Sequence, residues 1–439
     1  MTDNPTAVPG QARYSTIHIG LLGLGVVGSG TYKVLNDNAD AIERKVGARV
    51  NVKRIAVRDL AKERLVSVDR SLLTDDPLEV IEDPDISVVC ELIGGVQPAK
   101  EYVLRAIRQG KSVVSANKEL IAKDGHDAMV EAAAAGVDFM FEGSVGGGIP
   151  IIQAMKASLA GNTIYEVKGI VNGTTNYILT RMTQEGAGLA DVLSDAQARG
   201  YAEADPTNDV EGFDAQYKIA ILSSIAFTSR VETTDVYTEG IMRIGPHDIQ
   251  HAREMGYVIK LLAVGQRLGD DAVQVRVHPA LVPAEHPLAS TSGPNNAILV
   301  RGDAVGDVMF YGQGAGMMAT GSAVVGDIID VCRNMQHGAT GRIACTCFEH
   351  KRALPMDTVV TRYYVRMYVT DRPGTLSAIA GVFGRHQVSI ESVRASAQER
   401  AEAIWVTHRV QEANMRRALK DLSDIPEVYS IENWLRVED

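Results

Sequence analysis

Residues 16–28 read TIHIGLLGLGVVG, and this stretch decides the fold class. The apolar run at residues 16–22 predicts a buried strand, and the SGTYKVLNDNADAI that follows predicts a helix. A G-x-G-x-x-G turn joins them: two glycines let backbone amides approach a pyrophosphate at the helix start, and the third lets helix and strand pack closely. We therefore predict a Rossmann-type domain that binds a dinucleotide. The turn consists of Gly23, Leu24, Gly25, Val26, Val27 and Gly28.

The second predicted strand bears on which dinucleotide is bound. Residues 50–57 read VNVKRIAV and are followed by Arg58 and Asp59. An acid at the end of this strand binds the ribose 2′-hydroxyl of NAD, whereas an arginine meets the extra phosphate of NADP. Arg58 favours NADP, but a strand boundary shifted by one residue would favour NAD through Asp59. Both cofactors therefore stay open.

Two further strands are predicted to end in polar residues. Residues 86–93 (ISVVCELI) run into two glycines, and residues 111–116 (KSVVSA), which include Ser115, lead to Lys118. Ligands of doubly wound sheets gather at the carboxyl ends of the strands, so Lys118 is placed to meet a substrate or a nicotinamide. The alternative is a surface lysine that begins the next helix.

A glycine-rich loop ends the first predicted domain. Residues 137–142 predict a strand, and residues 143–150 read GSVGGGIP. Such a loop suits either a hinge between domains or a cation held by oxygen atoms, and the residues alone favour the hinge. We place this domain at residues 14–150 and expect a helix at about 312–340, after a GQGAG turn, to return to it. A plain helix start at that turn is the alternative.

Residues 200–227 read GYAEADPTNDVEGFDAQYKIAILSSIAF and hold acids and one lysine where a plain core helix would hold neither. From Glu211 the pattern predicts a helix with Asp214 and Lys218 in line with an apolar stripe. A buried ammonium costs several kcal/mol unless a carboxylate compensates it, and Asp214 lies one turn earlier. The alternative is a solvated pair beside an acidic helix start. Further acids crowd the preceding loop: Glu203, Asp205 and Asp209.

The rest of the chain predicts a mixed sheet and a small C-terminal domain. Residues 151–311 contain several strands, and the Asn-Gly-Thr-Thr turn at residues 172–175 offers hydroxyls and amides that suit a carboxylate. Residues 341–360 predict a linker. Residues 361–439 follow the order βαββαβ of a ferredoxin-like unit, for which we expect a role in regulation or assembly.

Composition excludes several classes of protein. The 439 residues carry a formal net charge of −11, which argues against nucleic acid as a partner. No apolar run reaches the roughly 18 residues that a membrane helix needs. The start, MTDNPTAVPGQAR, lacks the apolar core of a signal peptide, so we expect a cytoplasmic location. The four cysteines are too few for a disulfide scaffold and are expected to be reduced.

Together these motifs resemble the homoserine dehydrogenases of the bacterial type with a regulatory extension, across essentially the whole chain after residue 14. The unit that contains the Asp-Arg-Pro-Gly turn at residues 371–374 resembles an ACT domain, a module that commonly binds amino acids. Ala204, where relatives often have proline, is a departure that alters no candidate group. The resemblance is carried by residues 23–28, 115–118, 142–150, 172–175 and 200–206, with Asp209, Gly212, Asp214 and Lys218.

The resemblance implies an NAD(P)-dependent oxidoreductase that reversibly reduces L-aspartate 4-semialdehyde to L-homoserine, a step toward threonine, methionine and isoleucine. Residues 151–311 would then form the substrate-binding and catalytic domain. Residues 361–439 would form a regulatory ACT domain through which threonine inhibits the enzyme. The resemblance also implies a homo-oligomer, either a dimer or a tetramer.

The resemblance further assigns roles to single residues. Lys218 matches the proton donor to the carbonyl, Asp214 and Glu203 match residues that hold the substrate, and Lys118 matches a residue beside substrate and cofactor. Further substrate contacts match Tyr201, Gly173, Thr174 and Asp209, and Gly316 matches a glycine near the cofactor. The glycine-rich loop resembles a site for a monovalent cation, expected to be Na+, which replaces the hinge interpretation. Its oxygen donors match Glu142, Val145, Gly147 and Ile149.

The chemistry of these residues agrees with that reaction. Hydride delivery to an aldehyde builds negative charge on oxygen, so a cationic proton donor such as Lys218 lowers the barrier. Glu203 suits the ammonium of the substrate, and Thr174 with nearby amides suits its carboxylate. Two alternatives remain: a dehydrogenase of another semialdehyde or amino acid, and a non-catalytic sensor of dinucleotides and amino acids. A sensor would not need Lys218.

Overall fold

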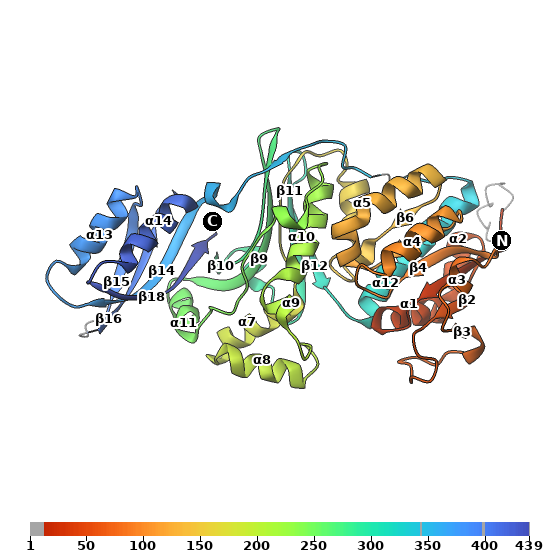
Figure 1. Ribbon diagram of the computed structural model, residues 1–439, viewed down its shortest axis with the longest axis horizontal. Helices are drawn as coiled ribbons and strands as arrows, with labels where there is room; N and C mark the ends of the chain where they lie inside the picture. Colours follow the sequence, from red (N-terminus) through yellow and green to blue (C-terminus); the bar gives the residue numbers. More distant parts are fainter. Residues whose placement is uncertain (1–12, 343–344, 397–399, 439) are drawn as a thin grey trace, which may run out of the picture. The chain divides into compact units, whose positions relative to one another are not determined.

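Six strands form the sheet of the first of two structural units (Figure 1). The computed structural model describes residues 13–342, 345–396 and 400–438, so most of the polar N-terminal segment lies outside the described residues. One unit comprises Met1–Ala157 with Ala315–Cys345, and the other comprises Ser158–Gly314 with Thr346–Asp439. Each unit is described below by itself.

The sheet of the first unit has the strand order β3-β2-β1-β4-β5-β6, with parallel pairing throughout. This order is that of a doubly wound dinucleotide-binding fold, in which ligands bind where the order reverses, between β1 and β4. The predicted Rossmann-type fold is confirmed. Its strands are β1 (Thr16–Leu22), β2 (Arg49–Ala56), β3 (Leu73–Thr74), β4 (Ile86–Glu91), β5 (Ser112–Ser115) and β6 (Phe139–Met140), and its helices are α1 (Val26–Asp37), α2 (Ala39–Val46), α3 (Leu78–Ile81), α4 (Ala99–Arg108), α5 (Lys118–Ala135), α6 (Ile151–Gln153) and α12 (Met317–His337).

Helix α12 belongs to this first unit although it follows the second sheet in the chain. Its residues Val324 and Ile328 share an apolar core with Ile19 of β1. Glycines let it approach α1 closely: a Cβ atom at Gly30 would lie 1.8 Å from the carbonyl oxygen of Met317. A Cβ at Gly321 would likewise lie 2.5 Å from the carbonyl carbon of Gly30. Backbone contact between the helices therefore requires glycine at both positions.

The second unit is built on a mixed sheet of order β12-β11-β7-β9-β10-β18-β14-β16-β15. Helix α10 packs on β7, β9 and β10, and a Cβ at Gly265 of β9 would meet Ser223 of this helix at 2.3 Å. The elements that precede the C-terminal domain are β7 (Ile164–Ile170), α7 (Gly173–Glu185), α8 (Leu189–Ala198), α9 (Thr207–Val210), α10 (Phe213–Ala226), β8 (Tyr237–Thr238), α11 (Pro246–Glu254), β9 (Tyr257–Leu268), β10 (Ala272–Pro283), β11 (Asn295–Gly302), β12 (Gly306–Gln313) and β13 (Arg352–Ala353).

The C-terminal elements form the predicted ferredoxin-like unit, with two helices and the strand order β18-β14-β16-β15. Strand β18 also pairs in parallel with β10, where Ala280 is opposite Arg436, so the two sheets are continuous. The elements are β14 (Val360–Thr370), α13 (Thr375–Arg385), β15 (Ile390–Ala395), β16 (Arg400–Thr407), β17 (Val410–Gln411), α14 (Glu412–Ser423) and β18 (Val428–Val437).

The predicted start of the lysine-bearing helix was wrong by two residues. Helix α10 begins at Phe213, not at Glu211, because Gly212 adopts a left-handed conformation with φ of 86° and separates it from the short helix α9. Asp214 and Lys218 keep the predicted alignment, and both are buried. None of the helices in the described part of the chain combines the length and apolar character needed to cross a membrane.

Candidate active site

Helix α10 carries the central pair of the candidate site, Lys218 and Asp214. The Lys218 Nζ lies 2.6 Å from Asp214 Oδ2 and donates to the carbonyl oxygen of Val171 at 2.7 Å. The two side chains are only 10% and 4% exposed. A buried ammonium is tolerated because a carboxylate and a carbonyl oxygen replace the lost water. This arrangement is the buried pair expected from the sequence and not the solvated alternative.

Asn172 connects this pair to the start of helix α7. Its Oδ1 accepts a hydrogen bond from the Thr175 amide at 2.8 Å, as an N-cap residue does. Its Nδ2 donates to Asp214 Oδ2 at 2.9 Å and to Asp209 Oδ1 at 2.6 Å. Sequence reasoning included this residue in a polar turn but gave it no role in the site. One asparagine thus orients two acids and caps the helix beside them.

The loop before α9 lies against the first turn of α7. Thr174 Oγ1 donates to the Tyr201 carbonyl oxygen at 2.9 Å, and the ring of Tyr201 stacks on Tyr177 with centroids 4.5 Å apart. A Cβ at Gly173 would lie 2.7 Å from the Pro294 carbonyl oxygen, so this position requires glycine. The carboxylate-bearing Glu203 is exposed. The structure therefore brings Thr174, Tyr201, Asp209, Asp214 and Lys218 to one end of α7.

In the first unit, the glycine-rich turn leaves open space at the start of α1. Gly23 has φ of 104°, and a Cβ at Gly28 would lie 2.2 Å from the Gly23 carbonyl oxygen, so both positions require glycine. Gly25 precedes α1 without a capping side chain, and a Cβ there would meet nothing within 4 Å. Amides at a helix start beside open space fit the pyrophosphate of a dinucleotide. Leu24 is buried in this turn, whereas Val26 is exposed.

The residues after β2 differ in what they contact. Asp59 accepts hydrogen bonds on Oδ1 from the amides of Ala61 at 2.8 Å and Lys62 at 3.3 Å, so its carboxylate stabilises a local turn. Arg58 lies just before it and is exposed. β2 ends at Ala56, one residue before the predicted boundary.

A buried acid that sequence reasoning missed organises the ends of β4 and β5. Glu91 accepts hydrogen bonds from Ser115 Oγ at 2.7 Å, from the Ile93 amide at 3.0 Å and from Asn117 Nδ2 at 3.4 Å. Burial raises the pKa of its carboxyl, although these hydrogen bonds oppose the shift. Asn117 in turn caps α5, whose first residue is Lys118. The sequence signal that could have identified Glu91 is the presence of an acid inside the apolar run ISVVCELI.

The predicted cation loop holds one buried acid, Glu142, and a second, Asp327 of α12, lies beside it. Glu142 accepts hydrogen bonds from the amides of Ile152 at 2.9 Å and Gln153 at 2.7 Å, and its own amide donates to Asp327 Oδ2 at 2.8 Å. Burial raises the pKa of both carboxyls, and the charge of Glu142 adds to the shift at Asp327. A cation nearby would stabilise both ionised forms, so the residues present fit one. Val145 and Ile149 are also buried, and Gly147 has φ of 55°.

The predicted residues thus fall into two groups. Lys218 and its neighbours belong to the second unit, whereas the glycine-rich turn, Ser115, Lys118, the Glu142 loop and Gly316 belong to the first. Gly316 has φ of 121° and precedes α12.

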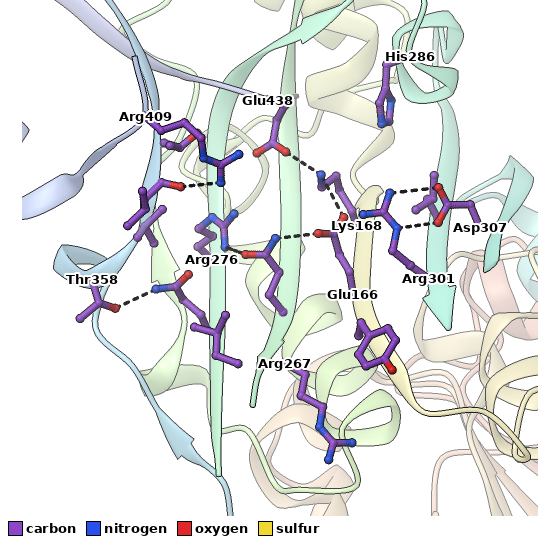
Figure 2. Close-up of a pocket in the computed structure, with 18 of the residues that line it drawn as sticks. Glu166, Lys168, Arg267, Arg276, His286, Arg301, Asp307, Thr358, Arg409 and Glu438 are labelled. Carbon is purple, nitrogen blue, oxygen red and sulfur yellow. Dashed lines mark hydrogen bonds and ion pairs between the residues drawn. The ribbon is translucent and has the colours of Figure 1, made fainter. Parts of the chain in front are cut away.

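A charged pocket of about 710 Å³ in the second unit contains none of the predicted site residues among its lining residues (Figure 2). Side chains alternate between the faces of a sheet, and Gly265 faces α10, so the neighbouring Gln266 of this pocket points to the opposite face. Lys168 Nζ lies 3.0 Å from Glu166 and 2.7 Å from Glu438. Burial acts to lower the pKa of Lys168, but these two carboxylates outweigh it and the net shift is upward. The pocket is therefore distinct from the Lys218 cluster.

Comparison with protein families agrees with this geometry. A family model described as "Homoserine dehydrogenase, NAD binding domain" matches residues 23–142. A second, "Homoserine dehydrogenase", matches residues 150–329, and a third, "ACT domain", matches residues 363–427. The first match covers β2 to β6, the second covers β7 to β12 with the first part of α12, and the third lies within the C-terminal unit.

Individual proteins match over almost the whole chain. A homoserine dehydrogenase of Bacillus subtilis is 42% identical over 96% of this chain and 98% of that protein, and one of Synechocystis is 44% identical over 96% and 99%. The crystal structure of a homoserine dehydrogenase from Thiobacillus denitrificans is 42% identical and covers 98% of this chain and 99% of that one, with a TM-score of 0.92. A hyperthermophilic archaeal homoserine dehydrogenase in complex with NADPH covers 72% of this chain and 97% of that one at 26% identity, with a TM-score of 0.62. Matched in its dinucleotide-binding turn, its mixed sheet and its ACT domain, the chain belongs to the homoserine dehydrogenases, a family of NAD(P)-dependent oxidoreductases.

Proposed function

We propose that this chain catalyses the reversible NAD(P)H-dependent reduction of L-aspartate 4-semialdehyde to L-homoserine, with Lys218 as the proton donor. The observation that carries the proposal is the buried contact of 2.6 Å between Lys218 Nζ and Asp214 Oδ2, in a chain of this family. Lysine is seldom buried unless it is paired, and a buried lysine–acid pair beside polar groups at a helix start suits acid–base chemistry.

Lys218 acts on the substrate carbonyl. NAD(P)H, when bound, supplies the hydride. As negative charge grows on the carbonyl oxygen, the ammonium of Lys218 stabilises that charge and transfers a proton to it. Asp214 holds Lys218 in position and contributes to substrate binding, and Asn172 orients Asp214. In the reverse direction, the neutral amine accepts the proton of the alcohol.

The loop and the turn around α7 hold the ends of the substrate. Thr174 and Gly173 suit the substrate carboxylate through the amides at the start of α7, since a helix start favours a negative charge. Glu203 suits the substrate ammonium, and Tyr201 and Asp209 complete this part of the site. These assignments place the substrate domain at residues 151–311.

Residues of the first domain, 14–150 with the helix at about 312–340, hold the cofactor. The six residues of the glycine-rich turn bind its pyrophosphate, Ser115 and Gly316 lie beside it, and Lys118 contacts both cofactor and substrate. Arg58 gives a preference for NADP, because the carboxylate of Asp59 is already engaged by two backbone amides. A monovalent cation, Na+, binds to oxygen atoms of Glu142, Val145, Gly147 and Ile149.

The C-terminal ACT domain, residues 361–439 after a linker at 341–360, makes the enzyme sensitive to threonine. A structural change caused by a small molecule bound there can be transmitted to the catalytic sheet, because β18 of the ACT domain pairs with β10. A homo-oligomer, dimer or tetramer, and a cytoplasmic location complete the proposal.

A single set of rate measurements tests these proposals. Oxidation of NADPH and of NADH is followed with L-aspartate 4-semialdehyde and with two other aldehydes, each with and without millimolar threonine. We expect the fastest turnover with aspartate semialdehyde and NADPH, and a lower rate with threonine. Faster turnover of another aldehyde would refute L-aspartate 4-semialdehyde as the substrate. An unchanged rate with threonine would refute inhibition by threonine. Point variants are preferable to removal of residues 361–439, because β18 is part of the catalytic sheet.

A further inference from the structure

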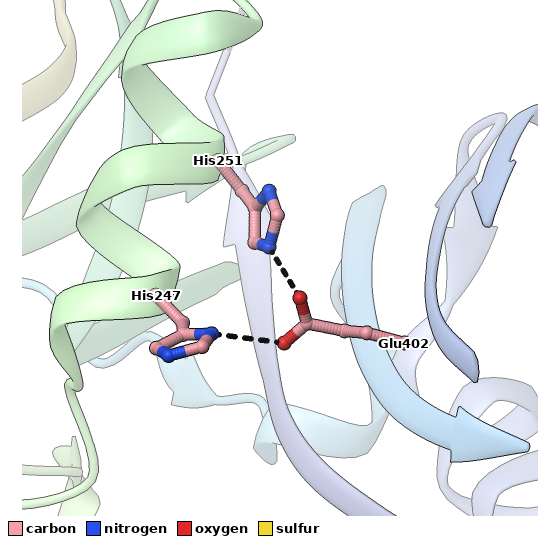
Figure 3. A group of neighbouring side chains, drawn as sticks. All are labelled: His247, His251 and Glu402. Carbon is pink, nitrogen blue, oxygen red and sulfur yellow. Dashed lines mark hydrogen bonds and ion pairs between the residues drawn. The ribbon is translucent and has the colours of Figure 1, made fainter. Parts of the chain in front are cut away.

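Two histidines and a glutamate meet where the ACT domain contacts the catalytic region (Figure 3). His247 and His251 are four residues apart on α11, so they lie on one face of that helix. Glu402 reaches them from β16 of the ACT domain. Figure 3 shows both imidazole rings pointing toward the two oxygens of this one carboxylate. Glu402 is distant in sequence from both histidines: it lies 151 residues after His251.

The spacing of the three groups suits a tetrahedral metal ion. His247 Nδ1 lies 3.2 Å from Glu402 Oε1, and His251 Nε2 lies 3.0 Å from Glu402 Oε2. One ligand atom from each residue can be chosen so that all three lie within 4.8 Å of one another. Bonds of about 2.0–2.2 Å to Zn²⁺ place tetrahedral ligand atoms roughly 3.4 Å apart. Small side-chain movements therefore suffice to bring the three atoms around one ion.

The second nitrogen of His251 faces a further carboxylate. Its Nδ1 lies 3.7 Å from Glu254 Oε2, one turn along the same helix. Histidines that bind metals usually present their other ring nitrogen to a carboxylate or carbonyl group, which fixes the ring and raises its basicity. The contact between His251 and Glu254 involves a residue outside the His-His-Glu cluster, and it also indicates a metal ion at His251.

The local charge favours a divalent cation. Arg366 Nη1 lies 3.3 Å from Glu402 Oε1 and opposes a metal, but the same guanidinium is held by the buried Asp248, with Nε 2.7 Å from Oδ1. Asp248 thus balances Arg366, and the carboxylates of Glu402 and Glu254 remain beside the two imidazoles.

We propose that His247, His251 and Glu402 bind one Zn²⁺ ion, with water as the fourth ligand. The side chain of His247 is 60% exposed, so the ion can enter from solvent and a water molecule can complete the tetrahedron. The bound ion joins α11, which precedes β9 of the mixed sheet, to β16 of the ACT domain. This site is separate from the proposed catalytic residues and does not depend on their roles.

Titration of the metal-free full-length protein with Co²⁺ and Zn²⁺ tests the proposal. Co²⁺ in a tetrahedral site has a characteristic intense visible spectrum, and Zn²⁺ affinity follows from competition with a coloured chelator. We expect one equivalent of each ion per chain, and weaker binding at acidic pH, because protonated imidazoles cannot bind metal.

Variants locate the site. His251→Ala and the shape-conserving Glu402→Gln should abolish the tetrahedral Co²⁺ spectrum, and Glu254→Gln should weaken Zn²⁺ binding about 10-fold. The matched control is His386→Ala, since His386 also pairs with an acid of the ACT domain, Asp421 at 2.7 Å, outside the cluster. Its metal binding should equal that of the unmodified protein. The absence of stoichiometric binding, an octahedral spectrum, or unchanged binding in Glu402→Gln would each overturn the proposal.

Discussion

Two buried ion pairs in the second unit show how different cations suit different tasks. Arg436 and Glu412 meet through two contacts, Nε to Oε2 at 2.9 Å and Nη2 to Oε1 at 2.6 Å. Lys218 and Asp214 meet at 2.6 Å between Nζ and Oδ2. A guanidinium stays charged and fixes its partners in a planar fork, whereas a lysine amine can give up its proton. The first pair is therefore suited to a fixed structural role, and the second to acid–base chemistry.

The positions of the two pairs agree with this difference. Arg436 is the second-last residue of β18 in the ACT domain, and its Nη1 also lies 2.7 Å from Glu239 Oε2, next to β8 in the catalytic region. Tyr363 adds a hydrogen bond to Glu412 at 2.7 Å. Every charge in this network thus has a partner from a neighbouring element. The Lys218 pair instead lies beside Asn172 at the start of α7, where a substrate carboxylate is expected.

Breaking the arginine pair should have the largest effect on stability. Glu412→Gln leaves the guanidinium of Arg436 buried without its main counter-charge, which costs about 3–5 kcal/mol. We expect the free energy of unfolding, measured by urea denaturation, to fall by this amount, while turnover of the folded fraction is retained. A loss of turnover without a loss of stability would contradict the structural role.

Breaking the lysine pair should have its main effect on turnover. Asp214→Asn keeps the shape of the side chain but removes the charge that orients Lys218, and hydrogen bonds to charged groups contribute about 1.5–3 kcal/mol. We expect kcat to fall about 10- to 100-fold. Steady-state kinetics measure it, and cofactor affinity should be unchanged. Unchanged kcat would mean that Asp214 does not position Lys218.

A third buried cation, Lys260, sharpens the comparison because its contacts include no ion pair in the described residues. Its Nζ donates to the Thr291 carbonyl oxygen at 2.6 Å and to Asn176 Oδ1 at 3.1 Å, and burial lowers its pKa from 10.5 to about 8. Between these values the unfolded chain binds a proton that the folded chain lacks, so stability rises with pH by up to about 1.4 kcal/mol per unit. Lys260→Met should remove this rise, as seen by urea unfolding from below pH 8 to above pH 10. If the free energy of unfolding rose equally steeply with pH in both proteins, the lowered pKa of Lys260 would be contradicted.

An exposed pair with the same fork geometry should matter least. Arg301 contacts Asp307 through Nε to Oδ1 at 2.7 Å and Nη2 to Oδ2 at 3.1 Å, and both side chains are about half exposed. Asp307→Asn should lower the free energy of unfolding by less than about 1 kcal/mol, because water screens the pair. An effect as large as that of Glu412→Gln would mean that burial does not explain the difference.

Much of the fold could be predicted because its signals are local. The Gly23 turn between a buried strand and a helix, and the βαββαβ order after residue 361, each lie within one short stretch. Gly212 shows where such signals fail: the apolar pattern predicted a helix from Glu211, but this glycine adopts a left-handed conformation, and α10 begins only at Phe213.

The candidate site was predictable only in part because several of its contacts are long-range. Asp214 and Lys218 lie one turn apart, so their pairing followed from spacing. Glu91 and Asn172 were not assigned roles, because their importance arises from partners 24 and 42 residues away, Ser115 and Asp214. The His247, His251 and Glu402 cluster depends on a contact between two domains, for which the sequence contains no local pattern.

The most direct test of the account is turnover by Lys218→Ala, with Lys260→Met as the control for the loss of a buried ammonium. General acid catalysis contributes about 100- to 10,000-fold, so kcat for aspartate semialdehyde reduction should fall by that factor in Lys218→Ala. NADPH affinity, measured by fluorescence, should persist, and Lys260→Met should keep its turnover. Near-normal turnover in Lys218→Ala would contradict the assignment of Lys218 as the proton donor.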